Sequence, residues 1–316
     1  MTIGDELVSE AVLPSFEVRF PAVIDSTMLT CFRACPMKFY YEYCRRLAPQ
    51  AISPDLHAGG AFAAGIEAVR NALYQENLAL EAALAAGVQA LTKYWGSYEP
   101  PEGHAKTYVN MTNALFDYFE HYKPETEHVK PYMTEGRPAT EFRIAHPMPV
   151  NHPVTGEPLV FAGRFDMLGE VASQLFVVDE KTTTRFAYNW SRQWALRSQF
   201  LGYTWACREQ GLPVEGAIVR GIAILKSEFK HLEAMIQMPQ WQLDRWYAQT
   251  VRDMQRMVHC WTSGWFDMNY GESCSSYGGC QFEILCTARE PELWFGDFKE
   301  RVWNPLHRDP TEPTIT

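Results

Sequence analysis

The sequence predicts an α/β fold in which helices flank a central mixed sheet. Three observations support this fold class. Apolar residues recur with helical spacing in the first part of the chain, strand-like apolar runs cluster in the middle, and a helix, two strands and a further helix follow. A sheet of this kind buries its faces under helices, and we expect the N- and C-terminal segments to form a helical cap.

The composition is that of a globular protein. The 316 residues can bury a large core, as one domain or one domain with an appendage, and 47% of them are hydrophobic. No apolar run reaches 18 residues, and the acidic N-terminus lacks the features of a secretory signal, so we expect a cytoplasmic protein without a membrane span. The formal net charge of −10 requires any affinity for nucleic acid to come from local basic residues and bound metal ions.

The first half of the chain is predicted to be mostly helical. Polar residues at 25–27 are N-cap candidates, and Pro36 must interrupt or kink the helix that follows because it lacks a backbone donor. In order, the predicted segments are an extended arm (1–24), the interrupted helix (26–46), a loop with proline and glycine (48–60), and two helical regions (60–92 and 104–122).

The second half contains the strands. Prolines at 124, 131, 138, 147, 149 and 153 make 123–158 a predicted loop with short strands such as 139–146. The following segments are two strands (161–171 and 175–182) joined by a polar turn at Ala172, Ser173 and Gln174, a helix (189–211), two strands (216–225 and 231–238), a helix (239–263) and an irregular tail (264–316).

The two central strands end in charged residues. Asp166 ends one apolar run, and Asp179, Glu180 and Lys181 end the next. A hairpin would bring Asp166 and Asp179 together as hard oxygen ligands for Mg²⁺, and strand alternation places Lys181 on the same face as Asp179. The alternative is a solvated hairpin end with a salt bridge, and this stretch alone leaves both interpretations open.

A motif in the next helix favours the metal site. In the run SQFLGYTWA, Gln199 and Tyr203 are four residues apart and share a helical face. The order GRFD, VVDEKT and Q-x-x-x-Y resembles the PD-(D/E)XK nuclease superfamily in its RecB-like exonuclease branch, which includes CRISPR-adaptation exonucleases, the AddB nuclease domain and phage enzymes. The opening helix STMLTCFRACPMKFYYEY resembles that of the family, so the similarity extends from about residue 26 to 290.

The resemblance implies a restriction-endonuclease-like core and a function. Asp166 and Asp179 would bind Mg²⁺ or Mn²⁺, Glu180 would be the variable middle residue that lends its backbone carbonyl, and Lys181 would be the catalytic lysine. The glutamine and tyrosine of the helix would position DNA and that lysine. The chain would then be a DNA exonuclease acting on single strands or free ends, in recombination, repair, or phage or CRISPR-type DNA processing, in a bacterial or phage-infected cell.

One position departs from the family pattern. Members of this branch usually carry a metal-binding histidine in G-x-x-x-H, and counting from Gly59 places Ala63 there. His57 and Glu67 are the possible substitutes, although Glu67 is more often a solvated helix residue. The alternative function is therefore a catalytically weakened nuclease fold that acts as a DNA-binding or scaffolding subunit.

The cysteines indicate a second metal centre. Cys274, Cys280 and Cys286 are spaced by five residues in a loop-rich segment with Gly278 and Gly279, and Cys35 of the Cys-Pro pair is the natural fourth ligand. Cys31 is the rival for that role, and the other three cysteines are expected to be small buried hydrophobes. Four thiolates can bind zinc or an iron–sulfur cluster. The resemblance to iron–sulfur members of the branch favours a [4Fe–4S] cluster that joins the two ends of the chain.

A basic and aromatic segment follows the catalytic strand. Arg185, Tyr188 and Arg192 are the candidates for contact with a DNA strand, because arginines bind phosphates and aromatic rings stack on unpaired bases. Trp194 and Phe200 are predicted to be core. The expected domains are the arm (1–24), the nuclease domain (25–290) with a helical insertion (about 60–122) and a cysteine-cluster cap (Cys35 plus 274–286), and a tail (291–316).

Overall fold

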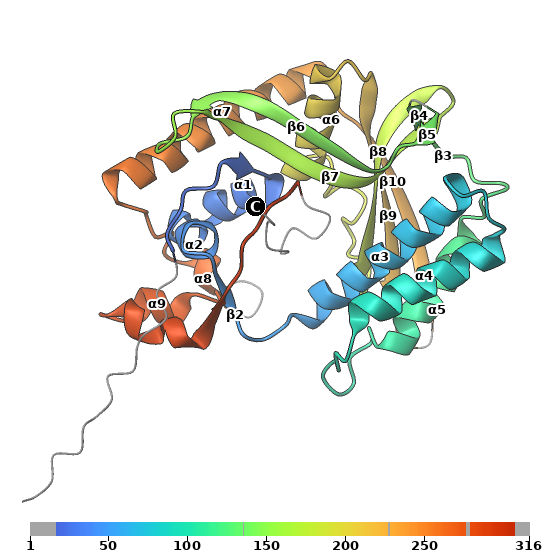
Figure 1. Cartoon of the computed structure of the whole chain (residues 1–316), viewed down its shortest axis with the longest axis horizontal. Helices are drawn as coiled ribbons and strands as arrows, with labels where there is room; N and C mark the ends of the chain where they lie inside the picture. Colours follow the sequence, from blue (N-terminus) through green and yellow to red (C-terminus); the bar gives the residue numbers. More distant parts are fainter. Residues whose placement is uncertain (1–16, 135, 227, 276–278, 307–316) are drawn as a thin grey trace, which may run out of the picture.

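The computed structural model describes residues 17–134, 136–226, 228–275 and 279–306. A seven-stranded mixed sheet lies at its centre, with helices packed on both faces (Figure 1). The sheet contains β1 (Val23–Ile24), β3 (Lys130–Pro131), β6 (Thr140–Asn151), β7 (Pro158–Val171), β8 (Gln174–Thr183), β9 (Val214–Ile224) and β10 (Phe229–Gln237). The longer helices are α1 (Ser26–Ala34), α3 (Pro54–Tyr74), α4 (Leu80–Trp95), α5 (Tyr108–His121), α6 (Ser198–Glu209) and α7 (Gln240–Ser263). The predicted fold class of a mixed sheet flanked by helices is confirmed.

The centre of the sheet is a hairpin followed by a crossover. Strands β7 and β8 are antiparallel, and both residues of their turn, Ala172 and Ser173, have positive φ, as a two-residue hairpin loop requires. The chain then passes through α6 to β9, which pairs parallel to β8, and returns antiparallel in β10. Strand β8 is therefore paired on both edges and covered by helices.

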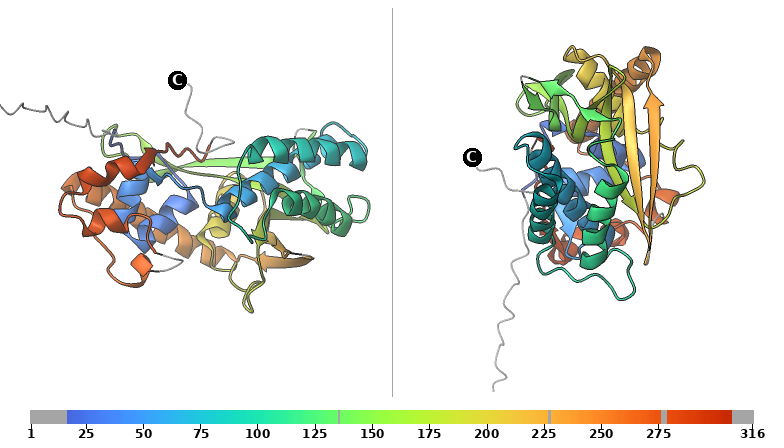
Figure 2. Two further views of the ribbon diagram at one scale, coloured as in Figure 1. Left: turned by 90° about the horizontal axis from the view of Figure 1, so that it is seen from below. Right: turned by 90° about the vertical axis from the view of Figure 1, so that its right-hand side faces the viewer.

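The two faces of the sheet bury different cores. Val177 and Val219 belong to a core shared with α1, α6 and α7. Ile222 and Ile224 belong to a second core under α3, α4 and α5. Figure 2 shows the three-helix group and the α6–α7 group as separate layers. Because side chains alternate along a strand, neighbouring residues of β8 face different sets of helices.

The N-terminal helix is interrupted as predicted. Helix α1 starts after Asp25, whose side chain accepts a hydrogen bond from Met28 N at 2.7 Å, and it ends before Cys35, which is extended. Pro36 then starts the short helix α2 (Pro36–Phe39), which continues into a π-helical turn, Tyr40–Cys44. The Cys-Pro pair thus forms a corner between two helices.

Four predicted boundaries were wrong. The helical region 60–92 is two helices, because α3 ends at Tyr74 and Asn77 takes a left-handed conformation before α4. Helix α3 also begins six residues earlier than predicted, where Ser53 caps it and Pro54 occupies the first turn. Helix α6 begins only at Ser198, since residues 189–197 form turns that bury two tryptophans. Strand β6 is longer than the short strand predicted, and its prolines lie where its register with β7 shifts.

The C-terminal part folds back onto the N-terminal part. Strand β11 (Phe298–Glu300) pairs antiparallel with β2 (Leu47–Pro49), and Trp303 Nε1 donates to Asp25 Oδ2 at 3.0 Å. The short elements α8 (Glu272–Ser275), α9 (Glu283–Thr287) and a 3₁₀ helix (Pro291–Asp297) lie at the same end as α2 and β2 (Figure 1), and a small hairpin, β4 (Met133–Thr134) with β5 (Arg137–Pro138), stands apart. Among the described helices, none combines the length and apolarity that crossing a membrane requires.

Candidate active site

The two predicted carboxylates lie where the central hairpin opens. Pairing between β7 and β8 ends at Met167 and Val178, so Asp166 and Asp179 are the next residues on each strand. The backbone N–H of Glu180 donates to Asp166 Oδ2 at 2.8 Å in place of a strand partner. Asp179 is only 4% exposed, which contradicts the alternative of a solvated hairpin end.

Lys181 and the helical pair lie beside Asp179. Lys181 Nζ is 2.5 Å from Asp179 Oδ2, as alternation along the strand predicted. From α6, Gln199 Nε2 donates to Asp179 Oδ1 at 3.1 Å and to the Tyr203 hydroxyl at 3.5 Å. The structure therefore brings together five residues that the sequence analysis selected from three separate motifs.

The charges of this cluster are not balanced. Burial, followed by repulsion from Asp179, Glu180 and Glu141, raises the pKa of Asp166 well above its ordinary value. Burial also raises the pKa of Asp179, although Lys181 opposes the shift. Burial would lower the pKa of Lys181, but the two aspartates outweigh it and the net shift is upward. The site lacks positive charge, and a bound cation would supply it.

The Glu180 side chain lies on the other face of β8. Arg70 of α3 donates to both carboxylate oxygens, with Nη1 at 3.0 Å from Oε2, and the Tyr118 hydroxyl of α5 donates to Oε1 at 2.8 Å. Burial opposes ionisation of Glu180, but Arg70 outweighs it and lowers the pKa to about 2. Arg220 extends this network through ion pairs of 2.9 Å to Glu127 and to Glu233. The carboxylate thus anchors the strand, and only the backbone of Glu180 faces Asp166.

Helix α3 also passes the site. Ala63 lines the same pocket as Asp166 and Asp179, so the position that carries histidine in the resemblance does face the carboxylates. His57 is on the helix and not in a loop, and its Nε2 lies 3.1 Å from the Trp95 carbonyl oxygen, away from the cluster. The expectation that Glu67 is solvated was wrong, since it is 8% exposed.

Glu141 is an acidic residue that the sequence analysis missed. It has a φ of 51°, an unfavourable conformation for a residue with a side chain, and its negative charge acts on Asp166. Its Oε2 is 3.1 Å from Arg164 Nε. Burial, with further contributions from Glu67, raises the pKa of Glu141 to about 7. Nothing in the local sequence marks it, because the residue lies in a proline-rich stretch and meets Asp166 only through strand pairing.

A pocket of about 560 Å³ opens at the cluster. Its lining includes the three threonines 182–184 that follow Lys181, and Lys106 from the loop before α5. The proposed strand-contact residues continue from this edge, and Arg185, Tyr188 and Arg192 are all exposed, Tyr188 by 99%. Trp194 and Phe200 are buried, as predicted for core residues.

The four predicted cluster ligands lie in one neighbourhood. Cys35, Cys274, Cys280 and Cys286 are each partly exposed, and none forms a disulfide. Burial and then the charges of Cys280, Cys35 and Cys274 raise the pKa of Cys286 to about 11. Cys31 is instead buried, with its sulfur 3.8 Å from a Glu42 oxygen. In the part of the chain that the structure describes, no three His, Cys, Asp or Glu side chains converge closely enough to bind a metal, and Gly278 lies outside that part.

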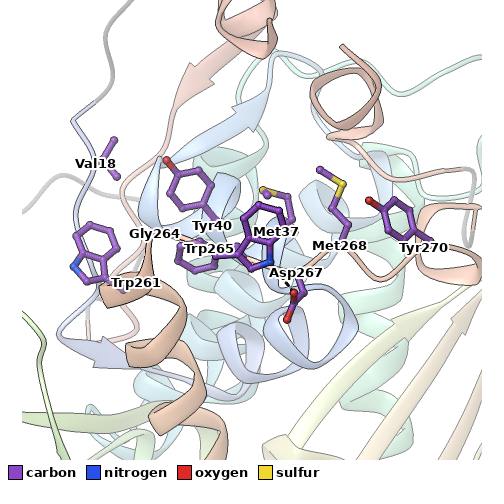
Figure 3. Close-up of a pocket in the computed structure, with 10 residues that line it drawn as sticks. Val18, Met37, Tyr40, Trp261, Gly264, Trp265, Asp267, Met268 and Tyr270 are labelled. Atoms are coloured by element: carbon purple, nitrogen blue, oxygen red, sulfur yellow. Dashed lines mark hydrogen bonds between the residues drawn. The ribbon is translucent and has the colours of Figure 1, made fainter. Parts of the chain in front are cut away.

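The segment after α7 covers the corner at Cys35. The Asp267 carbonyl accepts from Met37 N at 3.0 Å and lies 3.9 Å from Cys35 Sγ, while Asn269 Nδ2 donates to the Ala34 carbonyl at 2.7 Å. Between this segment and α2 is a second pocket of about 590 Å³ with mostly aromatic and methionine walls, in which Trp265 lies across from Tyr40 (Figure 3). These contacts hold the segment that leads to Cys274 against the corner at Cys35.

Comparisons with known proteins agree with these motifs. The chain matches the sequence profile of the PD-(D/E)XK nuclease superfamily over residues 26–287, which includes α1, the hairpin and α6. No curated protein matches it. Among solved structures it is similar to one described as the crystal structure of SSO0001, with 14% identity and a TM-score of 0.36, over 86% of this chain and 89% of that chain. A similarity of that size supports no inference about chemistry.

Proposed function

This chain belongs to the PD-(D/E)XK nuclease superfamily, and from that premise we propose that it is a metal-dependent DNA exonuclease of the RecB-like branch. Single-stranded DNA or free DNA ends would be its substrate, in recombination, repair, or phage or CRISPR-type DNA processing. The observation that supports this most is the group of Asp166, Asp179 and Lys181 at the opening of the hairpin, beside a pocket.

The donor set fits Mg²⁺ or Mn²⁺. Asp166, Asp179 and the backbone carbonyl of Glu180 would be hard oxygen ligands of the type these ions prefer. Asp179 Oδ2 is buried and, among the described residues, receives no well-directed hydrogen bond, although it is close to Lys181 Nζ. A buried carboxylate oxygen without a donor is costly unless a cation binds it. Such an ion would polarise the phosphate and the attacking water.

The protein's own residues would orient the reactants. Lys181 can hold the attacking water or stabilise charge that develops on the phosphate, because its ammonium lies at the carboxylates. Gln199 would keep Asp179 in one orientation through its 3.1 Å hydrogen bond. Arg185, Tyr188 and Arg192 would contact the strand outside the pocket, where their exposure leaves them available.

The test of this function is cleavage of end-labelled single-stranded DNA with added Mn²⁺. We expect shortening of the labelled strand by the wild type and none by Asp179→Ala. Activity that survives this substitution would show that Asp179 does not belong to the active site. A matched control is Asp244→Ala, because Asp244 is exposed on α7 and should leave cleavage unchanged.

We also propose that Cys35, Cys274, Cys280 and Cys286 bind a [4Fe–4S] cluster. The influence of the other three thiols on the pKa of Cys286 and the contacts around Cys35 support it, while the burial of Cys31 beside Glu42 argues against the rival ligand. An iron–sulfur cluster predicts a brown protein with iron and labile sulfide, whereas the zinc alternative predicts a colourless one. Cys286→Ser should lose the metal and Cys31→Ser should keep it. The reverse result would exchange the two assignments.

The second candidate function is a weakened nuclease fold that binds DNA without cutting it. Ala63 favours it, because this position lines the pocket yet offers no ligand. Binding without cleavage in any divalent ion would support this candidate. Ala63→His would then create cleavage activity if the missing ligand is the cause, and Ala64→His, one position along the helix, is the control.

A further inference from the structure

The pocket at the carboxylates extends past the metal site to a second lysine. Its floor beyond Lys181 is formed by Thr182, Thr183 and Thr184 at the end of β8. The first turns of α3 form one wall, where Gly59, Gly60 and Ala63 present little or no side chain. Lys106 and Asp55 also line it, beside Thr182. The pocket therefore extends along the strand from the carboxylates to a charged pair.

Of the two glycines in this wall, Gly59 faces the strand and Gly60 faces Tyr94 of α4. A Cβ on Gly59 would lie 3.6 Å from Thr182 Oγ1, and one on Gly60 would lie 2.3 Å from the hydroxyl of Tyr94. The latter distance is shorter than real contacts allow, so a side chain at residue 60 would displace Tyr94. The helix thus approaches β8 closely without filling the pocket.

Lys106 reaches into the pocket from a well-fixed backbone. It immediately precedes Thr107, the N-cap of α5, and its own side chain is 3% exposed. Its ammonium donates to Thr182 Oγ1 at 3.2 Å and to the Thr182 carbonyl at 3.5 Å. Asp55 Oδ1 lies 2.8 Å from the same nitrogen, but the Asp55 side chain is 61% exposed. One partner of the lysine is therefore a strand residue, and the other is an exposed surface carboxylate that an incoming anion can replace.

Lys106 contacts β8 at some distance from the carboxylates that would bind the metal. Thr182 is three residues beyond Asp179, which is about 10 Å in an extended strand. An ammonium bonded to Thr182 is too far from the carboxylates to contact the phosphate that they would hold. It is placed for another phosphate of the same DNA strand.

We propose that Lys106, with the Thr182 hydroxyl, is a phosphate-binding subsite for the DNA backbone next to the cleaved linkage, and that Asp55 vacates the ammonium when DNA binds. This inference rests on the proposed nuclease function and specifies where the substrate strand runs. This subsite would position the DNA strand through its phosphate backbone, without reading the base sequence.

The test is the salt dependence of binding to an oligothymidine strand in Ca²⁺, which binds hard oxygen ligands. Lys106→Met keeps the length of the side chain and removes the charge. It should weaken binding about tenfold and reduce the slope of log K against log salt by about 0.7, the contribution of one single-strand phosphate contact. Lys230→Met is the control, because Lys230 is an exposed lysine paired with Glu228 on another part of the sheet. An unchanged slope for a folded Lys106→Met would overturn the proposal.

Asp55→Asn tests the same idea in the opposite direction and leaves Lys106 itself in place. It removes the competing anion, so DNA binding should become about threefold tighter. Unchanged or weaker binding would contradict the proposed exchange. Mn²⁺ binding measured by calorimetry should be the same in both variants and the wild type, and a loss there would reassign Lys106 to the metal site. If the wild type binds and cleaves no DNA while it binds Mn²⁺, the proposed nuclease function fails instead.

Discussion

Two consecutive carboxylates of β8 have opposite environments. Asp179 faces α6 and the pocket, with a partly exposed lysine and a raised pKa. Glu180 faces α3 and α5, with an ion pair to Arg70 that is 4% exposed on both sides and a pKa lowered to about 2. Both are buried, so burial does not distinguish them. What distinguishes them is how fully each carboxylate is paired. Asp179 is incompletely paired and can accept a cation, whereas Glu180 is fully paired and holds the strand in place.

The largest expected effect comes from changing the pocket side of this comparison. Asp179→Asn should reduce cleavage by about a thousandfold or more, because it removes the charge of a proposed metal ligand, which would be worth several kcal/mol in the transition state. Its thermal unfolding midpoint should not fall, since the unbalanced charge is removed. The two measurements are single-turnover cleavage and thermal unfolding without metal. A large loss of stability would mean that Asp179 is structural, as Glu180 is.

Changing Glu180, the fully paired carboxylate, should affect stability more than cleavage. Glu180→Gln leaves Arg70 without a countercharge and should lower the free energy of unfolding by about 3 kcal/mol. Arg70→Met in the same chain should recover part of that loss, which urea unfolding of the single and double variants would reveal. Glu228→Gln is the exposed control, with an expected change below about 0.5 kcal/mol. Additive single and double effects would show that Arg70 and Glu180 are not coupled.

The sequence was sufficient to predict the neighbours of Asp179 and insufficient to predict those of Glu180. Asp166, Asp179, Lys181, Gln199 and Tyr203 lie within one hairpin and the following helix. Hairpin pairing and strand alternation predicted that the first three meet, and the resemblance to the nuclease superfamily implied that the two helical residues lie beside them. The partners of Glu180 come from far along the chain. The hydrogen bond from Arg70 spans 110 residues, and it depends on a helical region whose start and division were both mispredicted.

The same limit applies to the other unpredicted residues. Glu141 meets Asp166 through the pairing of β6 with β7, and Lys106 meets Thr182 through the packing of a loop on a strand end. Neither contact has a local periodicity that could reveal it. The one available signal was Arg70, a single arginine in the apolar surface of α3. A buried charge without a partner is too costly to persist, so this residue indicated a carboxylate partner elsewhere in the chain.

The two sides should also differ in their response to pH without metal. Asp166 has a raised pKa, so its protonated form stabilises the fold, and that contribution is lost as pH rises through the folded-state value. The contribution of Glu180 is present above the ordinary glutamate pKa and disappears as pH falls toward about 2. Acidification from pH 8 toward about 5 should therefore raise the unfolding midpoint.

Asp166→Asn and added Mg²⁺ separate these contributions. Either change should reduce the rise at mildly acidic pH, to which Glu141 and Asp179 also contribute through their raised pKa values. The substitution removes one of the titrating groups, and the ion holds the aspartates ionised. Neither should alter the loss of stability at strongly acidic pH, where Glu180 is protonated. A profile for Asp166→Asn that parallels the wild type would assign the pH dependence to other residues.

The smallest expected effect concerns a single hydroxyl. Tyr118→Phe removes a donor to Glu180 but leaves Arg70 in place, so it should cost about 1 kcal/mol of unfolding free energy. Tyr122→Phe, at the C-cap of α5, is a matched control. The ring at this position packs on the Arg220 guanidinium at 4.1 Å, and the substitution keeps the ring. If Tyr118→Phe also weakens Mn²⁺ binding while Tyr122→Phe does not, the paired side positions the backbone of Glu180 for the metal. If both variants bind Mn²⁺ as the wild type does, the two faces of β8 act independently, and the anchoring of Glu180 contributes only to stability.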